Sequence, residues 1–399
     1  MTGSGEDDGQ WRGWRAAARM TDAREDDGRP RHTDRMGFEV SAGELLRLRQ
    51  FTQRIDPIAT GSVTETVRHL LAIQAQDFAQ ALWAVGLRTK GSTRSDVLAA
   101  LDSGDVVRTL PMRGTLHFVA AEDLRWMLSL TAARSLQSVK TRNAQLGLDQ
   151  ATLDCAEAVT RRELAGRSMS RDDYLKLLSQ NGVSTDGQRG YHVIFQLAQL
   201  SLVCWGPSSG TQQALVLVDD WIPRQQPLAR DAALAQFARR YFASHGPATE
   251  RDFAWWSKLT LADVRAGMTA VGDELTELTH KGTSYWIATS ELDAASGGRA
   301  TSAVHALAGF DEYLLGYQDR LLPVALEHSD RVVPGSNGIF LPTVVTNGRV
   351  VGTWRRTPRS RAPKSVAAGI EPDHFTAASA ARLASFEKAA KRYARFVGA

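Results

Sequence analysis

Two glutamines separated by one residue, Gln74 and Gln76, are the side chains in this sequence best suited to joint chemistry. On an extended backbone, side chains at positions i and i+2 point the same way, whereas on a helix they do not. An extended segment here would therefore bring both amides to one place. A neutral amide cannot remove a proton from water at pH 7, but it can hold a water molecule by donating and accepting hydrogen bonds. Such a pair suits a reaction whose leaving group departs almost unaided.

The flanking residues predict that the pair lies at a junction between two helices. Residues 64–73 (TETVRHLLAI) carry apolar side chains at helical spacing. Asp77 then begins a second helix, where it can accept the backbone N–H of Gln80 and Gln80 can reciprocate. The alternative is that the two glutamines lie on a helix surface, because short motifs often match by chance.

Length and composition indicate a chain of several units without a membrane span. The 399 residues suffice for two or three domains, and 43% hydrophobic residues suffice for a core. No apolar run approaches the roughly 18 residues that a transmembrane helix needs, and we expect no secretory signal. Cys155 and Cys204 lack metal or redox spacing, and no histidines have zinc-ligand spacing. We therefore expect a cytoplasmic protein without a metal or cofactor.

The charge balance is mildly basic, with a formal net charge of +4 and a sequence pI of about 9.1. This balance is compatible with a polyanionic partner. Arginine outnumbers lysine, and its planar fork matches phosphate oxygens well. A GC-rich genome would produce the same arginine bias.

An internal repeat is predicted beyond a polar N-terminal extension. Residues 1–37 are rich in Gly, Asp and Arg and are expected to be disordered, with Met36 as an alternative start. Thr93, Ser170 and Thr249 each begin the same pattern of a hydroxyl residue, two polar residues, an Asp and an apolar residue. Each pattern is a relative of the capping box that begins a helix. Their spacings of 77 and 79 residues favour a repeated unit.

The segments after these caps predict winged helix-turn-helix units. After Ser170 the pattern is a helix, an Asn-Gly stop, a second helix and a hairpin. After Thr249 come two helices and a hairpin with Lys281-Gly282 at its tip, and after Thr93 a helix and a hairpin. We predict an α+β fold with tandem winged helix-turn-helix units at residues 38–145, 146–244 and 245–298.

Residues 299–399 are predicted to form a C-terminal β-hairpin-rich segment and a closing helix. Asn347-Gly348 joins two β-rich runs, which is a strong hairpin signal, and Pro342 favours an edge strand. The final residues form an amphipathic helical pattern with Leu383 among its apolar positions. Basic residues at hairpins and after the last β-rich run are candidate phosphate contacts, namely Arg113, Lys281, Arg349, Arg355, Arg356, Arg359 and Arg361.

The chain resembles the AlkZ/YcaQ-type winged-helix DNA glycosylases, bacterial enzymes that excise bulky N-alkylated bases and unhook interstrand crosslinks. The similar stretches are LLAIQAQD, VVRTLPMRGTLHFV, GPATERDFAWWSKL, GFDEYLLGYQDR and NGIFLPTVVTNGRVVGTWRR. The resemblance implies a C-shaped array of tandem winged helices around a basic concave surface. It also implies catalytic roles for Gln74 and Gln76, because the AlkZ branch carries a Gln-aliphatic-Gln motif. The YcaQ branch has Asp where this chain has Gln76, and Ala75 is a minimal aliphatic residue.

The resemblance supplies a reaction that two amides could assist. An N7-alkylated purine is already cationic, so its glycosidic bond can break by dissociation, and water needs only to be positioned. We expect a monofunctional DNA glycosylase acting on cationic N7-alkylpurines, including bulky adducts or interstrand crosslinks, in double-stranded DNA. We expect it to act as a monomer associated with the nucleoid. One expected role is self-resistance to a DNA-alkylating natural product. The alternatives are a non-catalytic winged-helix transcriptional regulator and a protein that binds damage without cutting.

Several other polar residues have more than one interpretation. Asp77 could be a general base, although a helix cap already explains it. Arg113 could pair internally instead of gripping phosphate, and His117 is expected to be a buried core histidine. An internal salt-bridge or turn network, with catalysis as the alternative, is expected for Asp311, Glu312, Asp319 and Arg320. Trp255 and Trp256 are expected in the core, with stacking on DNA as the alternative.

Overall fold

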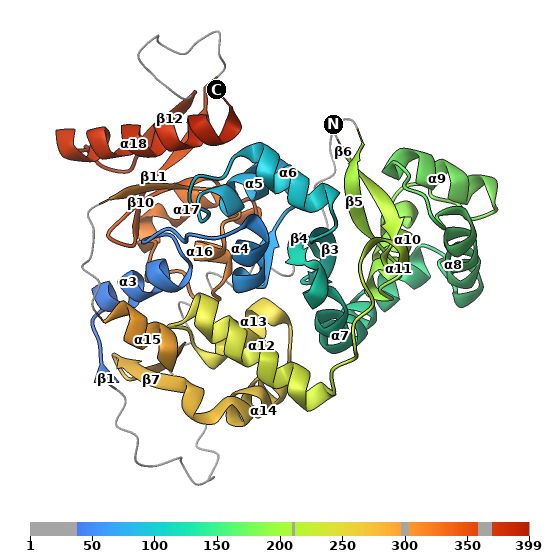
Figure 1. Ribbon diagram of the computed structural model, residues 1–399, viewed down its shortest axis with the longest axis horizontal. Helices are drawn as coiled ribbons and strands as arrows, with labels where there is room; N and C mark the ends of the chain where they lie inside the picture. Colours follow the sequence, from blue (N-terminus) through green and yellow to red (C-terminus); the bar gives the residue numbers. More distant parts are fainter. Residues whose placement is uncertain (1–37, 210–211, 297–302, 358–368, 399) are drawn as a thin grey trace.

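The computed structural model describes residues 38–209, 212–296, 303–357 and 369–398. The predicted disorder of residues 1–37 and the alternative start at Met36 lie outside them. Within these ranges the chain is a mixed α+β protein whose helices surround three small sheets (Figure 1). The order helix, short strand or bridge, two helices and hairpin occurs three times before the C-terminal segment. In the described ranges, no helix has both the length and the apolar character to span a membrane.

The first repeat contains the glutamine pair. β1 (Phe38–Glu39) and α3 (Ala42–Thr52) precede α4 (Val63–Leu70), β2 (Ala72–Gln74), α5 (Phe78–Gly86), α6 (Arg94–Asp102), β3 (Val106–Met112) and β4 (Thr115–Ala120). Ser62 and Glu65 form a capping box that begins α4. Leu71, with a φ of 66°, takes the chain out of the helix. The helix predicted to Ile73 therefore ends at Leu70, so Ala72 and Ile73 are extended instead of helical, and Gln74 is extended as predicted.

The other two repeats follow the same order. The second contains η1 (Ala121–Asp123), α7 (Leu124–Gln145), α8 (Gln150–Glu163), α9 (Arg171–Gln180), α10 (Arg189–Gln199), β5 (Val203–Ser209) and β6 (Gln212–Leu217). After α11 (Val218–Trp221), the third contains α12 (Arg230–His245), α13 (Glu250–Ser257), α14 (Leu261–Val271), η2 (Gly272–Glu274), β7 (Leu275–His280), β8 (Thr283–Ala288) and α15 (Thr289–Ala295). Single bridges, Met169 to Leu215 and Ala248 to Trp286, occupy the place of β2.

The helix caps show which positions of the repeats are equivalent. Ser170 and Thr249 cap α9 and α13, the first helices of their pairs, whereas Thr93 caps α6, the second helix of its pair. The counterpart of Ser170 in the first repeat is Asp77, which caps α5. The spacing of 77 residues between Thr93 and Ser170 therefore relates two helices that are not equivalent. The order of elements nevertheless recurs.

The sheets join parts of the chain that are distant in sequence. One sheet has the order β2-β4-β3-β5-β6, so the hairpins of the first two repeats share it through the pairing of Arg108 with Trp205. Another has the order β1-β7-β8, with β1 parallel to β7. α12 packs on α14 and shares a core with α13. The predicted boundary after residue 244 therefore lies between α12 and the two later helices against which it packs.

The C-terminal segment is a four-stranded sheet with short helices and a closing helix. Its elements are β9 (Val304–Leu307), α16 (Glu312–Leu315), η3 (Leu326–His328), α17 (Ser329–Val332), η4 (Pro334–Ser336), β10 (Thr343–Thr346), β11 (Arg349–Arg356), β12 (Ile370–His374) and α18 (Ala380–Val397). Asn347-Gly348 joins β10 and β11, which confirms the predicted hairpin. β10 lies between β11 and β9, so the edge strand predicted from Pro342 is wrong. Pro342 precedes the strand, where its missing N–H removes no ladder bond.

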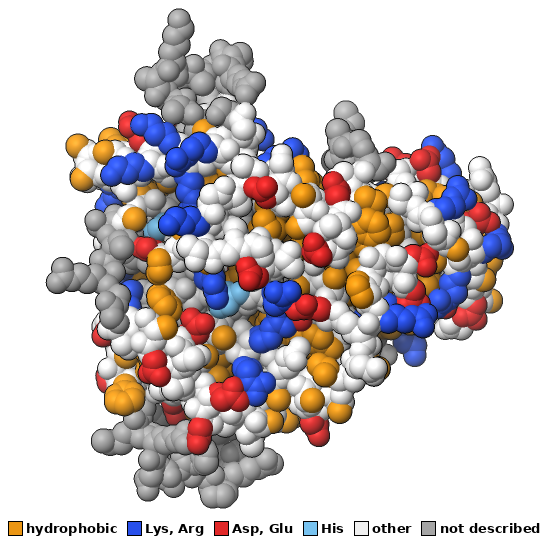
Figure 2. Space-filling model, in the orientation of Figure 1, with side chains coloured by type: hydrophobic (Ala, Val, Ile, Leu, Met, Phe, Trp, Pro, Cys, Tyr) orange, Lys and Arg blue, Asp and Glu red, His pale blue; other side chains and the backbone are white. Residues whose placement is uncertain are grey.

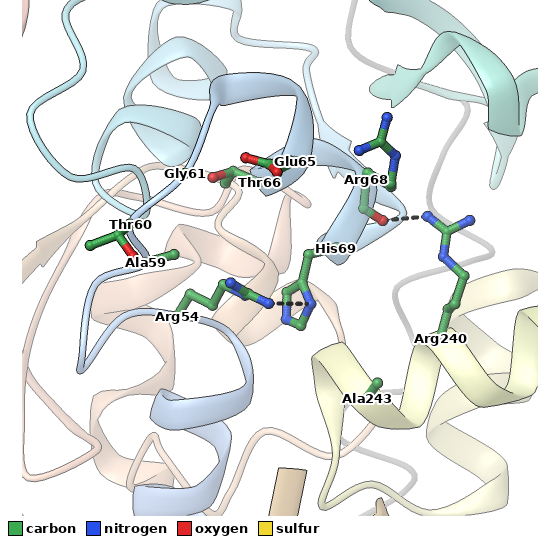
Figure 3. Close-up of a pocket in the computed structure, with 10 residues that line it drawn as sticks. All are labelled: Arg54, Ala59, Thr60, Gly61, Glu65, Thr66, Arg68, His69, Arg240 and Ala243. Atoms are coloured by element: carbon green, nitrogen blue, oxygen red, sulfur yellow. Dashed lines mark hydrogen bonds between the residues drawn. The ribbon is translucent and has the colours of Figure 1, made fainter. Parts of the chain in front are cut away.

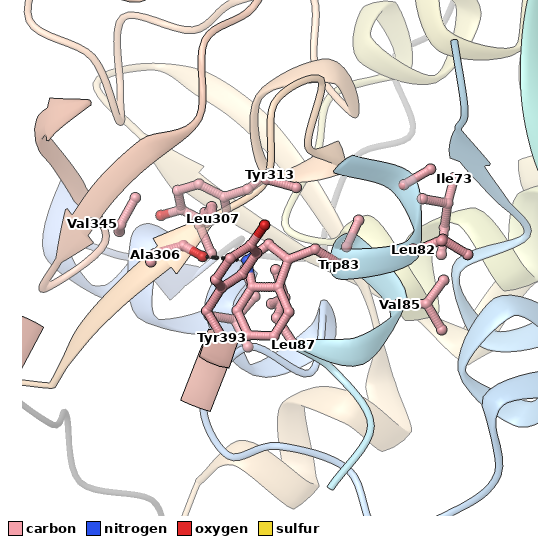
Figure 4. Close-up of a cluster of buried hydrophobic side chains, with 14 of the residues drawn as sticks. Ile73, Leu82, Trp83, Val85, Leu87, Ala306, Leu307, Tyr313, Val345 and Tyr393 are labelled. Carbon is pink, nitrogen blue, oxygen red and sulfur yellow. Dashed lines mark hydrogen bonds between the residues drawn. The ribbon is translucent and has the colours of Figure 1, made fainter. Parts of the chain in front are cut away.

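One hydrophobic core joins the first repeat to the C-terminal segment (Figure 4). Trp83 of α5 donates its indole N–H to the Ala306 carbonyl at 2.8 Å, and its ring meets Tyr393 of α18 edge-on at 5.1 Å. Gly86 of α5 lies directly against the ring of Phe396, which leaves no room for a larger residue. Leu383, predicted on the apolar side of the closing helix, is exposed instead.

Candidate active site

β2 and the turn after it place both motif glutamines at one point. Gln74 is the last residue of β2, and Gln76 precedes the Asp77 cap of α5. Gln74 Nε2 donates to Gln76 Oε1 at 3.0 Å, so the two amides face each other, as extended geometry predicts. Gln74 is only 7% exposed, whereas Gln76 is exposed to solvent. One amide is thus held in the protein and the other reaches outward.

The backbone of Ala75, between the two glutamines, is fixed by hydrogen bonds on both its N–H and its carbonyl group. Ala75 donates its N–H to the Leu116 carbonyl of β4 at 2.6 Å. Its carbonyl accepts from Nε and Nη2 of Arg108, at 2.9 and 2.7 Å. The methyl group of Ala75 is fully buried in the core shared with the C-terminal segment. The small side chain therefore occupies a packed position directly behind the pair.

Charged side chains set the orientation of Gln74. Glu312 Oε1 accepts the backbone N–H of Gln74 at 3.0 Å, and Arg113 Nη2 donates to Gln74 Oε1 at 3.4 Å. Because a guanidinium can only donate, the Gln74 oxygen faces Arg113 and its NH2 group faces Gln76. The direction of the hydrogen bond between the two amides follows from this contact.

Arg113 reaches Gln74 from the tip of the β3–β4 hairpin. Arg113 and Gly114 have φ values of 56° and 65°, as a two-residue type I′ turn requires. Arg113 Nη1 also donates to the Leu315 carbonyl at 3.0 Å, and Nη2 lies 2.9 Å from His117 Nε2. The Arg113 side chain is only 7% exposed. The structure thus places this predicted phosphate contact beside a motif glutamine and not on the open surface.

The groups behind Gln74 keep fixed protonation states near neutral pH. Burial alone would raise the pKa of Glu312, but His245 and Arg113 outweigh it and lower that pKa to about 2. The second carboxylate oxygen of Glu312 accepts the Trp256 indole N–H at 2.8 Å. Burial and the charge of Arg113 lower the pKa of His117 to about 3. His117 is therefore neutral and fully buried, as predicted, and donates from Nδ1 to the Thr115 carbonyl at 2.8 Å.

The remaining acids have structural contacts. Asp77 caps α5 by accepting the Gln80 N–H at 3.1 Å, as predicted. Gln80 does not reciprocate, because its Oε1 accepts the Gly309 N–H at 2.8 Å. Asp311 forms a buried two-bond pair with Arg88, at 2.6 and 3.0 Å. That pair is part of the internal network that the sequence predicted.

A second arginine lies close to Arg113. Arg320 is buried between the rings of Trp255 and Phe340, 4.7 and 5.0 Å from their centroids, and donates Nε to the Leu314 carbonyl. Burial and the charge of Arg113 lower the pKa of Arg320 to about 9, so it stays protonated at pH 7. The fully buried indole of Trp256 belongs to the core, whereas Trp255 is half-buried beneath the two arginines.

The other predicted phosphate contacts lie on hairpins at the surface. Lys281 is at the tip of β7–β8, Arg349 begins β11, and Arg355 and Arg356 end it, all four exposed. Arg355 lies 3.6 Å from Glu371 of the neighbouring strand. The predictions for Arg359 and Arg361 lie outside the described residues. Within the described ranges, Lys281, Arg349, Arg355 and Arg356 make no hydrogen bond to the glutamine pair.

The sequence did not single out a basic surface on the closing helix. Figure 2 shows Lys and Arg side chains gathered over α18. Its basic residues are Arg382, Lys388, Lys391, Arg392 and Arg395. Alternation of these residues with the apolar positions of α18 was the signal available in the sequence.

A cavity of about 360 Å³ between α4 and α12 contains a different set of polar residues (Figure 3). Its lining includes Arg54, Arg68, His69 and Arg240. Arg68 pairs with Glu122, Arg240 with Asp123, and Arg54 contacts His69 at 3.2 Å. Its three arginines thus already have protein partners, two of them carboxylates, and neither motif glutamine lines it. In the described part of the chain, no group of His, Cys, Asp and Glu side chains could hold a metal ion.

Comparison with known proteins identifies the family. The model of the AlkZ-like DNA glycosylase family matches residues 67–396, which is more than four-fifths of the chain. This protein is a member of that family. An interstrand DNA cross-link repair glycosylase of Streptomyces sahachiroi is 27% identical over 332 residues, spanning 79% of this chain and 88% of the relative. The solved structure of Streptomyces sahachiroi DNA glycosylase AlkZ has a TM-score of 0.75 and 25% identity, covering 90% of this chain and 98% of that one. The AlkZ-like protein is therefore a DNA glycosylase of DNA repair, which confirms the prediction of an enzyme.

Proposed function

We propose that this AlkZ-like glycosylase hydrolyses the N-glycosidic bond of cationic N7-alkylated purines in double-stranded DNA. The observation that carries the proposal is the 3.0 Å contact between two neutral amides, one buried and one exposed. Glu312 is poorly suited to activate water, because it is buried, accepts hydrogen bonds from the protein on both oxygens and has a pKa lowered to about 2. The pair that remains can orient a water molecule but cannot ionise it.

Such a pair suffices only when the leaving group is already ionised. An N7-alkylated purine departs as a neutral base, and the sugar that it leaves resembles an oxocarbenium ion. The exposed Gln76 would meet the water, and Gln74 would set the direction of the Gln76 amide. An unmodified purine would also need protonation, for which neither glutamine is suited.

The repeated elements favour an array that follows the DNA backbone. We propose that the helix pair and hairpin of each repeat form a winged helix-turn-helix unit, with divisions near residues 145 and 244 and with the C-terminal segment completing a C-shaped monomer. Phosphate contacts would come from Lys281, Arg349, Arg355, Arg356, Arg359 and Arg361. Arg113 would instead orient the motif amide, because its side chain is buried against Gln74.

The Streptomyces sahachiroi relative suggests a wider range of DNA lesions as substrates of this chain. Because that relative is an interstrand cross-link repair glycosylase, we include bulky adducts and crosslinks among the substrates of this chain. The same chemistry would serve a bacterial cell as self-resistance to a DNA-alkylating natural product, at the nucleoid in the cytoplasm.

Base release from a duplex with one N7-methylguanine tests the proposal, with free base and abasic sites measured against a no-enzyme control. Gln76→Ala should slow single-turnover release about 100-fold, the size of effect seen when one oriented polar group is removed. DNA affinity should not change. Gln150→Ala, a change at an exposed glutamine of α8, is the matched control.

Two results would contradict the proposal. A Gln74→Ala/Gln76→Ala double variant with the wild-type rate would remove the motif from the mechanism. A wild-type protein that releases no base, but binds one DNA sequence preferentially, would favour a regulator.

A further inference from the structure

A second cavity, of about 350 Å³, lies where the first and second repeats meet. It is bounded by the five-stranded sheet and by α5, α9 and α10. Three aromatic rings, two arginines and an amide are among its lining residues, namely Phe78, Tyr191, Trp205, Arg108, Arg171 and Gln213. Aromatic walls with a few polar groups are typical of sites that bind flat ring systems.

The cavity begins one side chain away from the motif. Arg108 lines it and also donates two hydrogen bonds to the Ala75 carbonyl between the glutamines. Phe78, which lies 5.3 Å below the Arg108 guanidinium, follows Gln76 by two residues. A substrate whose reacting bond lies at Gln76 could therefore reach the cavity by passing the motif backbone at the edge of the sheet.

The strand register separates the cavity from the buried amide. Gln74 is paired with His117, whereas Arg108 is paired with Phe118 and Trp205. Cross-strand partners share a face of a sheet, and successive residues lie on opposite faces. The Gln74 amide and the cavity are thus on opposite faces of the sheet. A group in the cavity belongs to a part of the substrate beyond the reacting sugar.

Gln213 indicates what kind of group enters. It lines the cavity and is 4% exposed, and its Nε2 donates to the Gly206 carbonyl at 3.0 Å. Among the described residues, its buried Oε1 has no hydrogen-bond partner. A buried acceptor is unfavourable without a donor, so an N–H or O–H from a ligand would complete it.

We propose that this cavity binds an aromatic group at the far end of the N7 substituent of a bulky lesion, with Gln213 accepting a hydrogen bond from that group. The inference rests on the proposed function. In a purine, only C8 separates N7 from N9, which carries the sugar. A substituent on N7 therefore starts beside the reacting bond and can extend past the motif backbone. Phe78, Tyr191 and Trp205 would stack on its ring.

The test compares two duplexes, one with N7-methylguanine and one whose N7 carries a hydroxynaphthyl group on a short alkyl linker. Trp205→Ala and Gln213→Leu should each slow release of the naphthyl-bearing base about 10-fold, the size of one lost stacking or hydrogen-bonding contact. Release of N7-methylguanine should stay within about twofold. The matched control is Gln199→Leu, at a buried glutamine whose oxygen also lacks a partner in the described residues but which does not line the cavity.

Each outcome decides the inference. Equal slowing on both lesions, or no slowing on either, overturns it, as does a loss of affinity for undamaged duplex that explains the slower release. If Trp205→Ala melts early, Tyr191→Ala decides, because Tyr191 is 44% exposed; Tyr191→Phe, which removes only the hydroxyl group that donates to the Gly114 carbonyl, is its control. A wild-type enzyme that releases neither base refutes the proposed function itself. If the wild-type enzyme releases N7-methylguanine but the variants show no selective slowing on the naphthyl-bearing lesion, only the proposed role of the cavity is refuted.

Discussion

Replacing Glu312 by glutamine tests whether a buried ion pair holds the glutamine motif in place. The change keeps the shape of the side chain and one carbonyl acceptor but removes the negative charge. Glu312 accepts from the Gln74 backbone and the Trp256 indole, and it lies 4.0 Å from the Arg113 guanidinium. Glutamine could accept only one of these hydrogen bonds, and it would leave Arg113 without its anion.

The size of the effect follows from the pKa of the carboxyl group. In the fold the pKa of Glu312 is lowered to about 2, from 4.5 in the unfolded chain. This difference corresponds to about 3 kcal/mol of stability at pH 7. Because the folded pKa is the lower one, this stability is complete above about pH 4.5 and is lost as the pH falls toward 2. Removing one partner of a buried pair costs a similar ~3–5 kcal/mol.

Thermal melting at pH 7 and single-turnover base release measure the outcome. Glu312→Gln should melt several degrees below wild type. It should also release base more slowly, because Arg113, which orients the Gln74 amide, loses its anion. Glu122→Gln is the matched control, since Glu122 and its partner Arg68 are 49% and 42% exposed and such pairs contribute at most about 1 kcal/mol. A Glu312→Gln protein that melts and reacts like wild type would refute the anchoring role.

Three further perturbations test the site, the titration behaviour and the core. Arg113→Lys keeps the charge but loses the fork that orients the motif amide, so single-turnover release should slow roughly tenfold at unchanged DNA affinity; weaker binding at an unchanged rate would instead indicate a phosphate contact. Burial and a neighbouring arginine lower the pKa of both His69 and His117 to about 3, so their stability contribution is complete above pH 6.5 and is lost as the pH falls toward 3. The melting temperature should decline across that range, and a constant value would show that neither ring is held neutral. Gly86→Ala would make its Cβ collide with the Phe396 ring and should cost about 1–3 kcal/mol in melting experiments, whereas wild-type stability would mean that α5 and α18 pack loosely.

Local patterns in the sequence predicted local geometry well. The facing amides of Gln74 and Gln76 follow from the period of an extended segment, and Asn347-Gly348 sets its own turn. The cap of α5 by Asp77 also depends only on neighbouring residues. These features need no information from the rest of the chain.

Features that depend on distant contacts were missed. Glu312 is 238 residues from the glutamine whose N–H it accepts, and no spacing links the two. The sequence placed Arg113 at a hairpin turn but could not show what that turn touches, so a phosphate contact and a buried one were equally compatible. The register of the repeat was mistaken because Thr93 has the same local cap as Ser170 on a helix that is not equivalent.

The long separation between Gln74 and Glu312 has a consequence for the newly made protein. A ribosome adding about 5–20 residues per second needs roughly 10–50 s to extend the chain by the 238 residues between them. During that interval the nascent motif has neither its carboxylate partner nor the closing helix against which α5 packs. Competence to cleave should therefore arise only near completion of translation, and polypeptides truncated before α16 should be inert toward the chromosome.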